Sequence, residues 1–254
     1  MLKGRQSEEH RDVAPMSGSD PSTLIPQPST LSISVIIPTL NEAGRIAELI
    51  ASTRQIGECE IIVVDGGSDD GTHERAASAD IVLTSEPGRA KQQNAGAAAS
   101  RGEVLLFLHA DCQLSAGAFE AIRAAMQDER TVGGCFEQHI EADGWLYRWL
   151  ERGNAWRVRW LGMAYGDQGI FIRRAIFEQL GQFPDVKLME DVLMMKRLRR
   201  AGRFVLLDER LSVSARRWQK HGIVRQTLRN WLLLTLALCG VSPDRLARLY
   251  PNTR

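Results

Sequence analysis

The stretch Arg101-Gly-Glu-Val-Leu-Leu-Phe-Leu-His-Ala-Asp-Cys-Gln-Leu114 decides the fold class. Within it, Val104–Leu108 is an unbroken apolar run of the length of a β-strand. Such a run, without alternating polar residues, is typical of a strand that is buried on both faces. Strands of that kind belong to parallel sheets that helices cover on both sides. The stretch therefore predicts a central strand of an α/β sheet.

The polar residues that follow this strand predict a ligand site. In an open parallel sheet, ligands bind beyond the carboxyl ends of the strands, and His109 and Asp111 follow such an end. Side-chain direction repeats every two residues in an extended chain, so both side chains should project to the same side. An imidazole and a carboxylate so placed could hold a divalent metal ion. The alternative is that Asp111 only caps the following helix, and the triplet alone favours neither.

The segments before the central strand alternate between strand and helix patterns. Apolar runs predict strands over 33–37, 61–64 and 81–83. Pro38 is expected to end the first strand and Asn41 to open a helix, and Arg89–Ser100 is an Ala-rich helix. Parallel pairing needs crossover helices, so this order predicts a doubly wound, mostly parallel sheet that helices flank. After the central strand we expect a helix over 115–127 and strands over 132–140, 170–173 and 204–207.

Composition limits the classes of function. The 254 residues suit one large domain or two small ones, and a formal net charge of +1 suggests no nucleic-acid partner. The four cysteines form no C-x-x-C pair, which argues against a zinc ribbon and fits a reducing cytoplasm. No signal-peptide pattern is present at the N-terminus, and the apolar run Trp231–Cys239 is too short to span a bilayer. The chain also contains neither a dinucleotide fingerprint nor a Walker loop.

The chain divides into three predicted parts. Residues 1–30, rich in Ser, Pro, Asp and Glu, are expected to be a disordered leader, and translation starts at Met1 or at Met16. Residues 31–215 form the α/β domain, and residues 216–254 form an amphipathic helical segment packed on it. We expect the leucines of that segment in a core or a homodimer face, with a peripheral membrane contact as the alternative.

Four tryptophans lie within sixteen residues, at positions 145, 149, 156 and 160. We expect a pair of helices that pack most of these rings into a core. The alternative for one of them is an acceptor-binding wall, because aromatic faces stack on sugar rings and other flat ligands.

Further polar residues allow both a structural and a functional interpretation. Glu190 and Asp191 begin a predicted helix, where the macrodipole favours anions, but an acid facing a cleft can also be a general base. Arg89 and its neighbours at a helix start suit phosphate groups or simply solvent. The basic turn 216–221 clamps a pyrophosphate or is a solvated loop, and the pattern favours neither.

Taken in order, these signals carry a family resemblance. The matching strings are Ser34-Val-Ile-Ile-Pro-Thr-Leu-Asn-Glu42, Val63-Val-Asp-Gly-Gly-Ser-Asp-Asp-Gly-Thr72, Gly88-Arg-Ala-Lys-Gln-Gln-Asn-Ala-Gly96, Phe107-Leu-His-Ala-Asp111 and Glu190-Asp191. Together they resemble the family 2 glycosyltransferases of the GT-A fold, over roughly residues 33–207. Two of the strings, 88–94 and 108–111, are similar to the small bacterial arsenosugar-biosynthesis and radical-SAM/selenodomain-associated subgroup.

The resemblance implies a role for each matching position. Asp191 would be the catalytic base with Glu190 beside it, and Asp111 would bind Mn²⁺ or Mg²⁺, with His109 in place of the first acid of the D-x-D motif. The nucleotide pocket would contain Pro38, Asn41, Glu42, Asp65, Arg89, Gln92, Gln93 and Asn94. Candidates for contact with the acceptor or the diphosphate are Asp167, Gln168, Arg216, Arg217 and Trp218. We also expect Asp111 and Asp191 to share one cleft.

The resemblance also implies an activity. It indicates an inverting enzyme that moves one sugar from a nucleoside-diphosphate sugar to a small-molecule or lipid-linked acceptor. The Q-x-x-R-W signature of processive enzymes is absent, and Arg216–Trp218 is the nearest candidate for its place. One alternative is a sugar-phosphate nucleotidyltransferase, although the loop after the first strand lacks the expected basic residues. The other is a nucleotide-sugar-binding protein without catalysis, which His109 motivates.

Overall fold

The structure is a computed structural model that describes residues 31–249 together with Met1. It leaves out the side chains of residues 217, 221, 238, 244, 248 and 249. The predicted leader, including Met16, and residues 250–254 lie outside the described residues.

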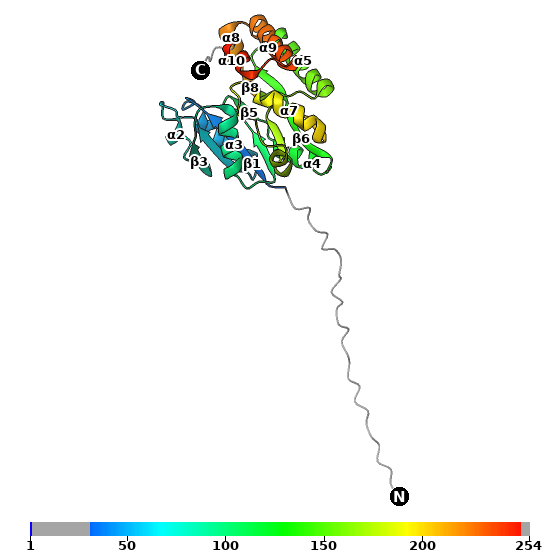
Figure 1. The fold of residues 1–254 in the computed structure, drawn as a ribbon. Helices are drawn as coiled ribbons and strands as arrows, with labels where there is room; N and C mark the ends of the chain where they lie inside the picture. The colour runs from blue at the N-terminus through cyan, green and yellow to red at the C-terminus, as the bar shows by residue number, and fades with distance from the viewer. Residues whose placement is uncertain (2–30, 250–254) are drawn as a thin grey trace. The chain divides into compact units, whose positions relative to one another are not determined.

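One eight-stranded sheet forms the centre of the described chain, in the strand order β3-β2-β1-β4-β7-β6-β8-β5 (Figure 1). Its strands are β1 Ile33–Thr39, β2 Glu60–Asp65, β3 Ile81–Thr84, β4 Val104–Phe107, β5 Cys112–Leu114, β6 Thr131–Glu141, β7 Ile170–Arg173 and β8 Arg203–Ser214. The helices are α1 Ile46–Ile56, α2 Thr72–Arg75, α3 Arg89–Ala99, α4 Ala118–Ala125, α5 Trp145–Leu161, the 3-10 helix η1 Gly166–Gln168, α6 Arg174–Gln179, α7 Glu190–Ala201, α8 Arg216–His221, α9 Ile223–Leu238 and α10 Pro243–Leu249.

The first four strands pair as the sequence predicts. β3, β2, β1 and β4 are parallel neighbours, and helices cross between them. From β4 onward the sheet is mixed: β7 is antiparallel to both β4 and β6, whereas β6 and β8 are parallel. β5 adds an antiparallel edge to β8. The change of direction at β4 places the start of β7 beside the carboxyl end of β4.

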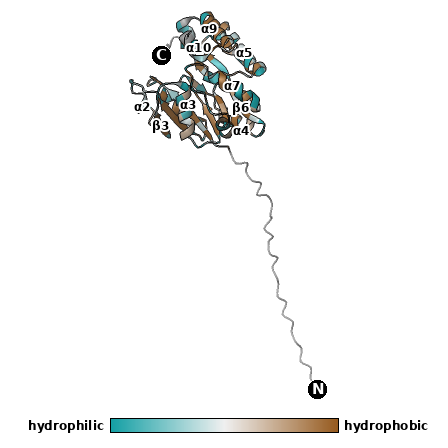
Figure 2. Ribbon diagram, viewed as in Figure 1, coloured by the Kyte–Doolittle hydropathy of each residue, from teal (hydrophilic) through white to brown (hydrophobic). Residues whose placement is uncertain are grey.

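Both faces of the sheet are buried, as the apolar runs predict. Alternate residues of each central strand belong to two different core clusters. Val104 and Leu106 belong to the cluster that includes buried side chains of α1 and α4, whereas Leu105 and Phe107 belong to the cluster that includes those of α3, α6 and α7. This is the alternation expected of a strand covered on two sides. Figure 2 shows the result as brown strands at the centre of the fold.

Three local predictions are wrong. β1 runs through Pro38 to Thr39, because proline lacks only a donor and Pro38 pairs near the end of the strand. Asn41 does not open α1, because this helix begins at Ile46. The backbone of Asn41, with a φ of 55°, instead turns the chain before the helix. The tryptophans from 145 to 160 lie on one helix, α5, rather than on a pair. All four are exposed, Trp145 to 75%.

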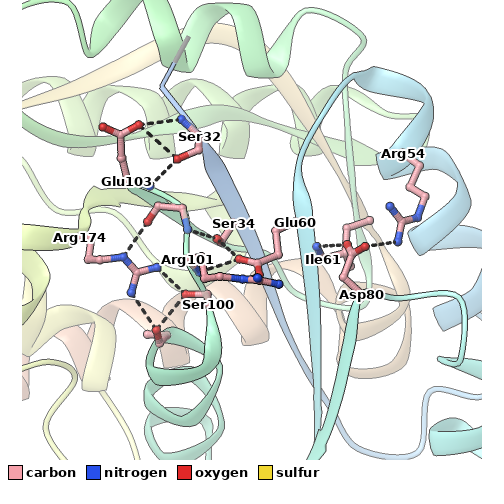
Figure 3. Close-up of polar contacts among 12 residues, drawn as sticks. Ser32, Ser34, Arg54, Glu60, Ile61, Asp80, Ser100, Arg101, Glu103 and Arg174 are labelled. Atoms are coloured by element: carbon pink, nitrogen blue, oxygen red, sulfur yellow. Dashed lines mark hydrogen bonds and ion pairs between the residues drawn. The ribbon is translucent and has the colours of Figure 1, made fainter. Parts of the chain in front are cut away.

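The amino ends of the parallel strands carry a closed polar network (Figure 3). Ser34 Oγ donates to Glu60 Oε2 at 2.6 Å, and the backbone N–H of Arg101 donates to the same oxygen at 2.7 Å. Asp80 accepts from Ile61 N at 2.7 Å and pairs with Arg54 at 3.0 Å. Each carboxylate is therefore used to join neighbouring strands.

No helix among the described residues has the length and apolar character needed to cross a bilayer.

Candidate functional site

The loops after β1 and β2 are joined at the carboxyl ends of these strands. Asn41 N donates to Ser68 Oγ at 2.9 Å, and Asn41 Oδ1 accepts from Asp69 N at 3.1 Å. Glu42 N donates to Thr72 Oγ1 at 2.9 Å. Asp65 is buried and accepts from both the N–H and the hydroxyl of Ser68. The predicted nucleotide residues of the two loops thus form one rigid rim.

The amides of α3 hold that rim in place. Gln92 Nε2 donates to Thr39 O at 2.7 Å and to Val64 O at 2.8 Å, which joins the ends of β1 and β2. Asn94 exchanges two hydrogen bonds with the backbone of Phe183, at 2.8 and 3.1 Å. Gln93 is buried as well. Gln92 and Asn94 therefore position loops, and the contact of residues 92–94 with a ribose or diphosphate stays a prediction.

His109 and Asp111 point into different hollows, which corrects the expectation from their spacing. β4 ends at Phe107, and Cys112 N donates to His109 O at 3.1 Å to close a turn over residues 109–112. The two-residue repeat of side-chain direction applies to extended chain, not to a turn. His109 is buried beside α7, whereas Asp111 lines a hollow of about 250 Å³ with Arg45 and Glu48.

Asp191 lies at the start of α7 with its carboxylate fixed by backbone donors. Gly166 N donates to Asp191 Oδ2 at 2.8 Å, and Val192 N donates to Oδ1 at 2.7 Å. The preceding Met189 has a φ of 70°, a conformation that costs energy for a residue with a side chain and is common at functional sites. Met189 thereby turns the chain so that both acids enter the helix start.

Gly166 separates Asp191 from His109. A Cβ at position 166 would lie 2.9 Å from His109 Nε2 and 3.7 Å from Asp191 Oδ2. The close approach of imidazole, backbone and carboxylate therefore depends on glycine at this position.

These groups line one cavity of about 90 Å³, which we call the Asp191 cavity. Glu190 is buried in it, with one oxygen 4.0 Å from Arg89. Its lining residues are Arg89, His109, Tyr165, Gly166, Asp167, Leu188, Met189, Glu190, Asp191, Asn230 and Leu233. A sugar nucleotide needs several hundred Å³, so the donor must extend beyond this cavity.

Among the hollows lined by described residues, Asp111 lines the one of about 250 Å³ and Asp191 lines the Asp191 cavity, so the expectation of one shared cleft stays a prediction. Their hollows adjoin through Cys112, whose Sγ lies 3.9 Å from both Asp111 Oδ1 and the backbone oxygen of Asp167. Asp167 in turn lines the Asp191 cavity. The two acids are therefore on adjacent sites separated by the turn 109–112.

A buried arginine braces the loop that holds Asp191. Arg157 of α5 donates to Met163 O at 2.8 Å and to Gln168 Oε1 at 2.7 Å, and its guanidinium lies 3.7 Å from the centre of the Tyr165 ring. Gln168 Oε1 also accepts from Tyr165 N at 3.1 Å. Gln168 is fully buried in this network, so the prediction that it contacts the acceptor or diphosphate is corrected.

Tyr165 lines the cavity and keeps its phenol protonated. Burial above all raises the pKa of Tyr165 to about 12; Arg157 opposes the rise, and Asp191 and Asp167 add to it. Its hydroxyl oxygen is buried away from solvent. Tyr165 therefore contributes a neutral ring beside Asp191 rather than a further charge.

The basic turn 216–221 forms helix α8, and its residues have separate environments. Arg216 pairs with Glu42 at 3.6 Å, which brings it to the rim of the β1 loop. Trp218 is buried in the core, so its predicted contact with the acceptor or diphosphate is wrong. The side chain of Arg217 is not among those the structure describes.

The described residues contain no group of three His, Cys, Asp or Glu side chains that could hold a metal ion. Mg²⁺ in nucleotide enzymes is commonly held by one or two carboxylates, with substrate phosphates and waters as the remaining ligands. The half-buried Asp111 carboxylate fits that donor set. The described residues do not form a metal cage made of protein ligands alone.

A family model, glycosyl transferase family 2, matches residues 34–181, more than half of the chain. The chain belongs to glycosyltransferase family 2. Among curated relatives, glycosyltransferase AglJ of Haloferax volcanii is 41% identical over 64 residues, 24% of this chain and 21% of its own length. The probable glycosyltransferase YdaM of Bacillus subtilis is 27% identical over 199 residues, 67% of this chain and 47% of its own length. The chain thus spans less than half of these relatives.

Solved structures define the fold. TarS of S. aureus in complex with UDP-GlcNAc superposes with a TM-score of 0.58 at 20% identity, over 72% of this chain and 58% of the TarS chain. The same protein with UDP superposes with a TM-score of 0.57 over 72% of this chain and 60% of the TarS chain. The GT-A fold expected from the sequence motifs is confirmed.

Several residues of the Asp191 cavity were not identified from sequence. Tyr165 and Met189 lie in irregular loops without a motif, and Gly166 begins the short 3-10 helix η1. Arg157 lies outside the cavity and acts through hydrogen bonds to the loop that holds Asp191. Asn230 and Leu233 come from α9, far along the chain. The one available signal was Gly166 beside Asp167, since a glycine in a polar loop commonly allows close approach of the backbone.

Proposed function

We propose that this protein is an inverting, non-processive glycosyltransferase that moves one sugar from a nucleoside-diphosphate sugar to an acceptor hydroxyl. One observation carries the proposal: the Asp191 carboxylate, oriented by two backbone N–H groups, lines a cavity with Arg89 and His109 in a chain of family 2. A carboxylate held in this way is suited to accept a proton from a bound hydroxyl group.

In the proposed reaction Asp191 accepts the acceptor's proton while the acceptor oxygen attacks the anomeric carbon. The bond from that carbon to the diphosphate oxygen breaks on the opposite face, so a single displacement inverts the configuration. Arg89 and Arg216, which lie at the Asp191 cavity and at the rim of the nucleotide loops, stabilise the negative charge on the leaving diphosphate.

A divalent cation, Mn²⁺ or Mg²⁺, belongs to the proposal. Asp111 would hold it beside the phosphates, and the ion would supply positive charge near the leaving group. His109, which lines the Asp191 cavity, is not part of this ligand set.

The donor is proposed to be a UDP-sugar by analogy with TarS, whose structures contain UDP-GlcNAc and UDP. It would extend from the Asp191 cavity along the rim that contains Pro38, Asn41, Glu42 and Asp65. The acceptor is a small molecule or a lipid-linked group. The narrower arsenosugar and selenodomain-associated subgroup rests on the strings 88–94 and 108–111 alone.

A cytoplasmic location is part of the same proposal. All four cysteines are free thiols, and Cys112 and Cys135 are buried. Burial raises the pKa of Cys59 to about 11. Free thiols suit a reducing compartment.

The test measures release of nucleoside diphosphate from a panel of UDP- and GDP-sugars, with Mn²⁺ and with a chelator. Water can replace the acceptor, so the full chain should hydrolyse its donor slowly, and Asp191→Asn should reduce this by about 10²–10⁴-fold. Thermal shift should show that the variant still binds the donor. Binding without any turnover in the wild-type chain, with or without candidate acceptors, would favour the non-catalytic alternative. Near-normal turnover of Asp191→Asn would exclude it as the base.

A further inference from the structure

The exposed apolar side chains of this protein are concentrated on two helices. Apart from Met1, every large apolar side chain that is exposed in the described part of the chain lies on α5 or α9. Five of the six tryptophans belong to this set, and the sixth, Trp218, is buried. We call the set the α5/α9 surface; its residues are Trp145, Trp149, Trp156, Trp160, Leu161, Val224, Leu228, Trp231 and Leu232.

Helical spacing places each group on one side of its helix. At 100° per residue, positions 145, 149, 156 and 160 of α5 fall within about 60° of one another. Val224, Leu228 and Trp231 form the corresponding stripe on α9, while Gln226 and Leu233 on the other side are buried. Figure 1 draws α5, α8, α9 and α10 at the same end of the domain, and Figure 2 shows brown stretches along α9.

Basic residues predominate around the α9 stripe, whereas α5 carries Glu151 as well as arginines and follows the exposed Asp143. Between Glu209 and Asp244 the sequence contains no Asp or Glu, and it contains six Arg or Lys residues there: Arg210, Arg216, Arg217, Lys220, Arg225 and Arg229. On α5, Arg152 and Arg159 lie on the exposed side between the tryptophans. Arg159 forms ion pairs with Glu137 and Asp208. Among the described residues, Arg152, Lys220 and Arg225 form no ion pair with an acidic side chain within 4.0 Å.

We propose that the α5/α9 surface docks on an anionic lipid bilayer surface. Tryptophan is enriched at membrane interfaces, where its ring is buried among acyl chains and its N–H stays among the head groups. Each basic side chain near an anionic leaflet adds favourable electrostatic energy. A second copy of this chain is the less favourable occupant, since a symmetric contact would bring the carboxylate-free segment 210–243 close to its own copy.

The docking surface adjoins the Asp191 cavity. Asn230 and Leu233, on the inner side of α9, line that cavity, while Trp231 and Leu228 on its outer side are exposed. A helix with its side chains is about 10–12 Å across. Docking would thus place the membrane about one helix diameter from Asp191. Resting on the proposed function, this geometry favours a lipid-linked acceptor over a freely diffusing one.

The test is flotation of the full chain with vesicles of phosphatidylcholine alone or of equal parts phosphatidylcholine and phosphatidylglycerol. We expect binding to the anionic vesicles that weakens as salt screens the charges. Tryptophan fluorescence should shift to the blue and be quenched by brominated lipid, with the buried Trp218 as the unchanged background. Absence of binding to anionic vesicles at low salt would overturn the proposal.

Substitutions on the α5/α9 surface test whether this surface is the one that binds the vesicles. Trp149→Ser with Trp156→Ser, and Leu228→Ser with Trp231→Ser, should each reduce the partition coefficient by at least about tenfold, because each removes two buried apolar anchors. Lys220→Gln with Arg225→Gln should weaken binding at low salt, whereas Arg101→Gln, an exposed arginine at the opposite end of the sheet, should not. Binding that survives both apolar double variants would overturn the assignment.

Two further measurements separate the alternatives. Sedimentation of the wild-type chain without lipid should show a monomer; a dimer that both apolar double variants convert to a monomer would assign the surface to a second copy instead. Donor hydrolysis without vesicles should be unchanged in all these variants. Vesicle binding without donor hydrolysis would contradict the proposed function and leave the docking proposal intact. Donor hydrolysis without vesicle binding would contradict the docking proposal and leave the proposed function intact.

Discussion

The two ends of the parallel strands use acidic residues in opposite ways. At the amino ends, Glu60 and Asp80 are closed off by serine, arginine and backbone donors from neighbouring segments (Figure 3). At the carboxyl ends, Asp191 accepts two backbone N–H groups and still lines a cavity. The comparison teaches that hydrogen-bond satisfaction alone does not separate a structural acid from a functional one. What distinguishes them is whether the donors leave an oxygen facing open space.

The largest effect is expected at the brace behind the carboxyl end. Arg157→Met should lower the free energy of unfolding by about 3 kcal/mol, since it leaves Met163 O without its side-chain donor and Gln168 Oε1 with Tyr165 N alone. It should also lower kcat, because the Gly166 loop that orients Asp191 loses its support. Urea denaturation and donor hydrolysis measure the two effects. A variant with full activity and lowered stability would show that the loop keeps its position without Arg157.

At the amino end the effects should be on stability alone. Glu60→Gln removes the charge that accepts from Ser34 and Arg101 and should cost about 1–2 kcal/mol in unfolding free energy. Donor hydrolysis per folded molecule should stay unchanged. Loss of activity in this variant, measured at a temperature where it is fully folded, would contradict the division between the two ends.

Gly166→Ala should affect activity more than stability, unlike Glu60→Gln. The added Cβ would contact His109 Nε2 at 2.9 Å and force the imidazole away from Asp191. We expect kcat to fall by about tenfold and the free energy of unfolding to change by less than about 1 kcal/mol. Gly153→Ala, where nothing lies within 4 Å of the new Cβ, is the matched control. Equal activity of the two variants would show that the close approach at position 166 has no catalytic value.

The smallest effect is the acid dependence of the amino-end network. Burial raises the pKa of Glu60, but the hydrogen bonds from Ser34 and Arg101 outweigh it, so the pKa lies below its ordinary value of 4.5. A carboxyl whose pKa is lower in the folded state stabilises the fold above its ordinary pKa and loses this contribution as pH falls through the folded value. The free energy of unfolding should therefore decrease below pH 4.5, and less steeply in Glu60→Gln. Denaturation over a pH series measures both slopes.

The sequence predicted the elements whose pattern is local. The run Val104–Leu108 and the runs before it predicted the parallel strands correctly, because burial on both faces leaves a direct mark on composition. The sequence did not predict hydrogen bonds between residues that are far apart in the chain. Gln92 binds the ends of two strands 28 and 53 residues away, and no local pattern records such bonds.

The tryptophans of α5 show a different limit. A stripe at helical spacing has the same pattern whether it faces a core or a membrane surface. α5 carries a second apolar stripe, with Tyr147, Leu150 and Val158 buried on the sheet, so the tryptophans were left outside. The prediction that His109 and Asp111 project to the same side was wrong for another reason. It applied the two-residue repeat of side-chain direction, which holds for extended chain, across a turn.

The contribution of α9 to the Asp191 cavity has a practical consequence. Asn230 and Leu233 are the cavity-lining side chains that come from this helix. A small combinatorial library at these two positions would therefore change the wall of the cavity while leaving the proton acceptor and its loop untouched. Selectivity could then be redesigned by exchanging one surface of the single helix α9.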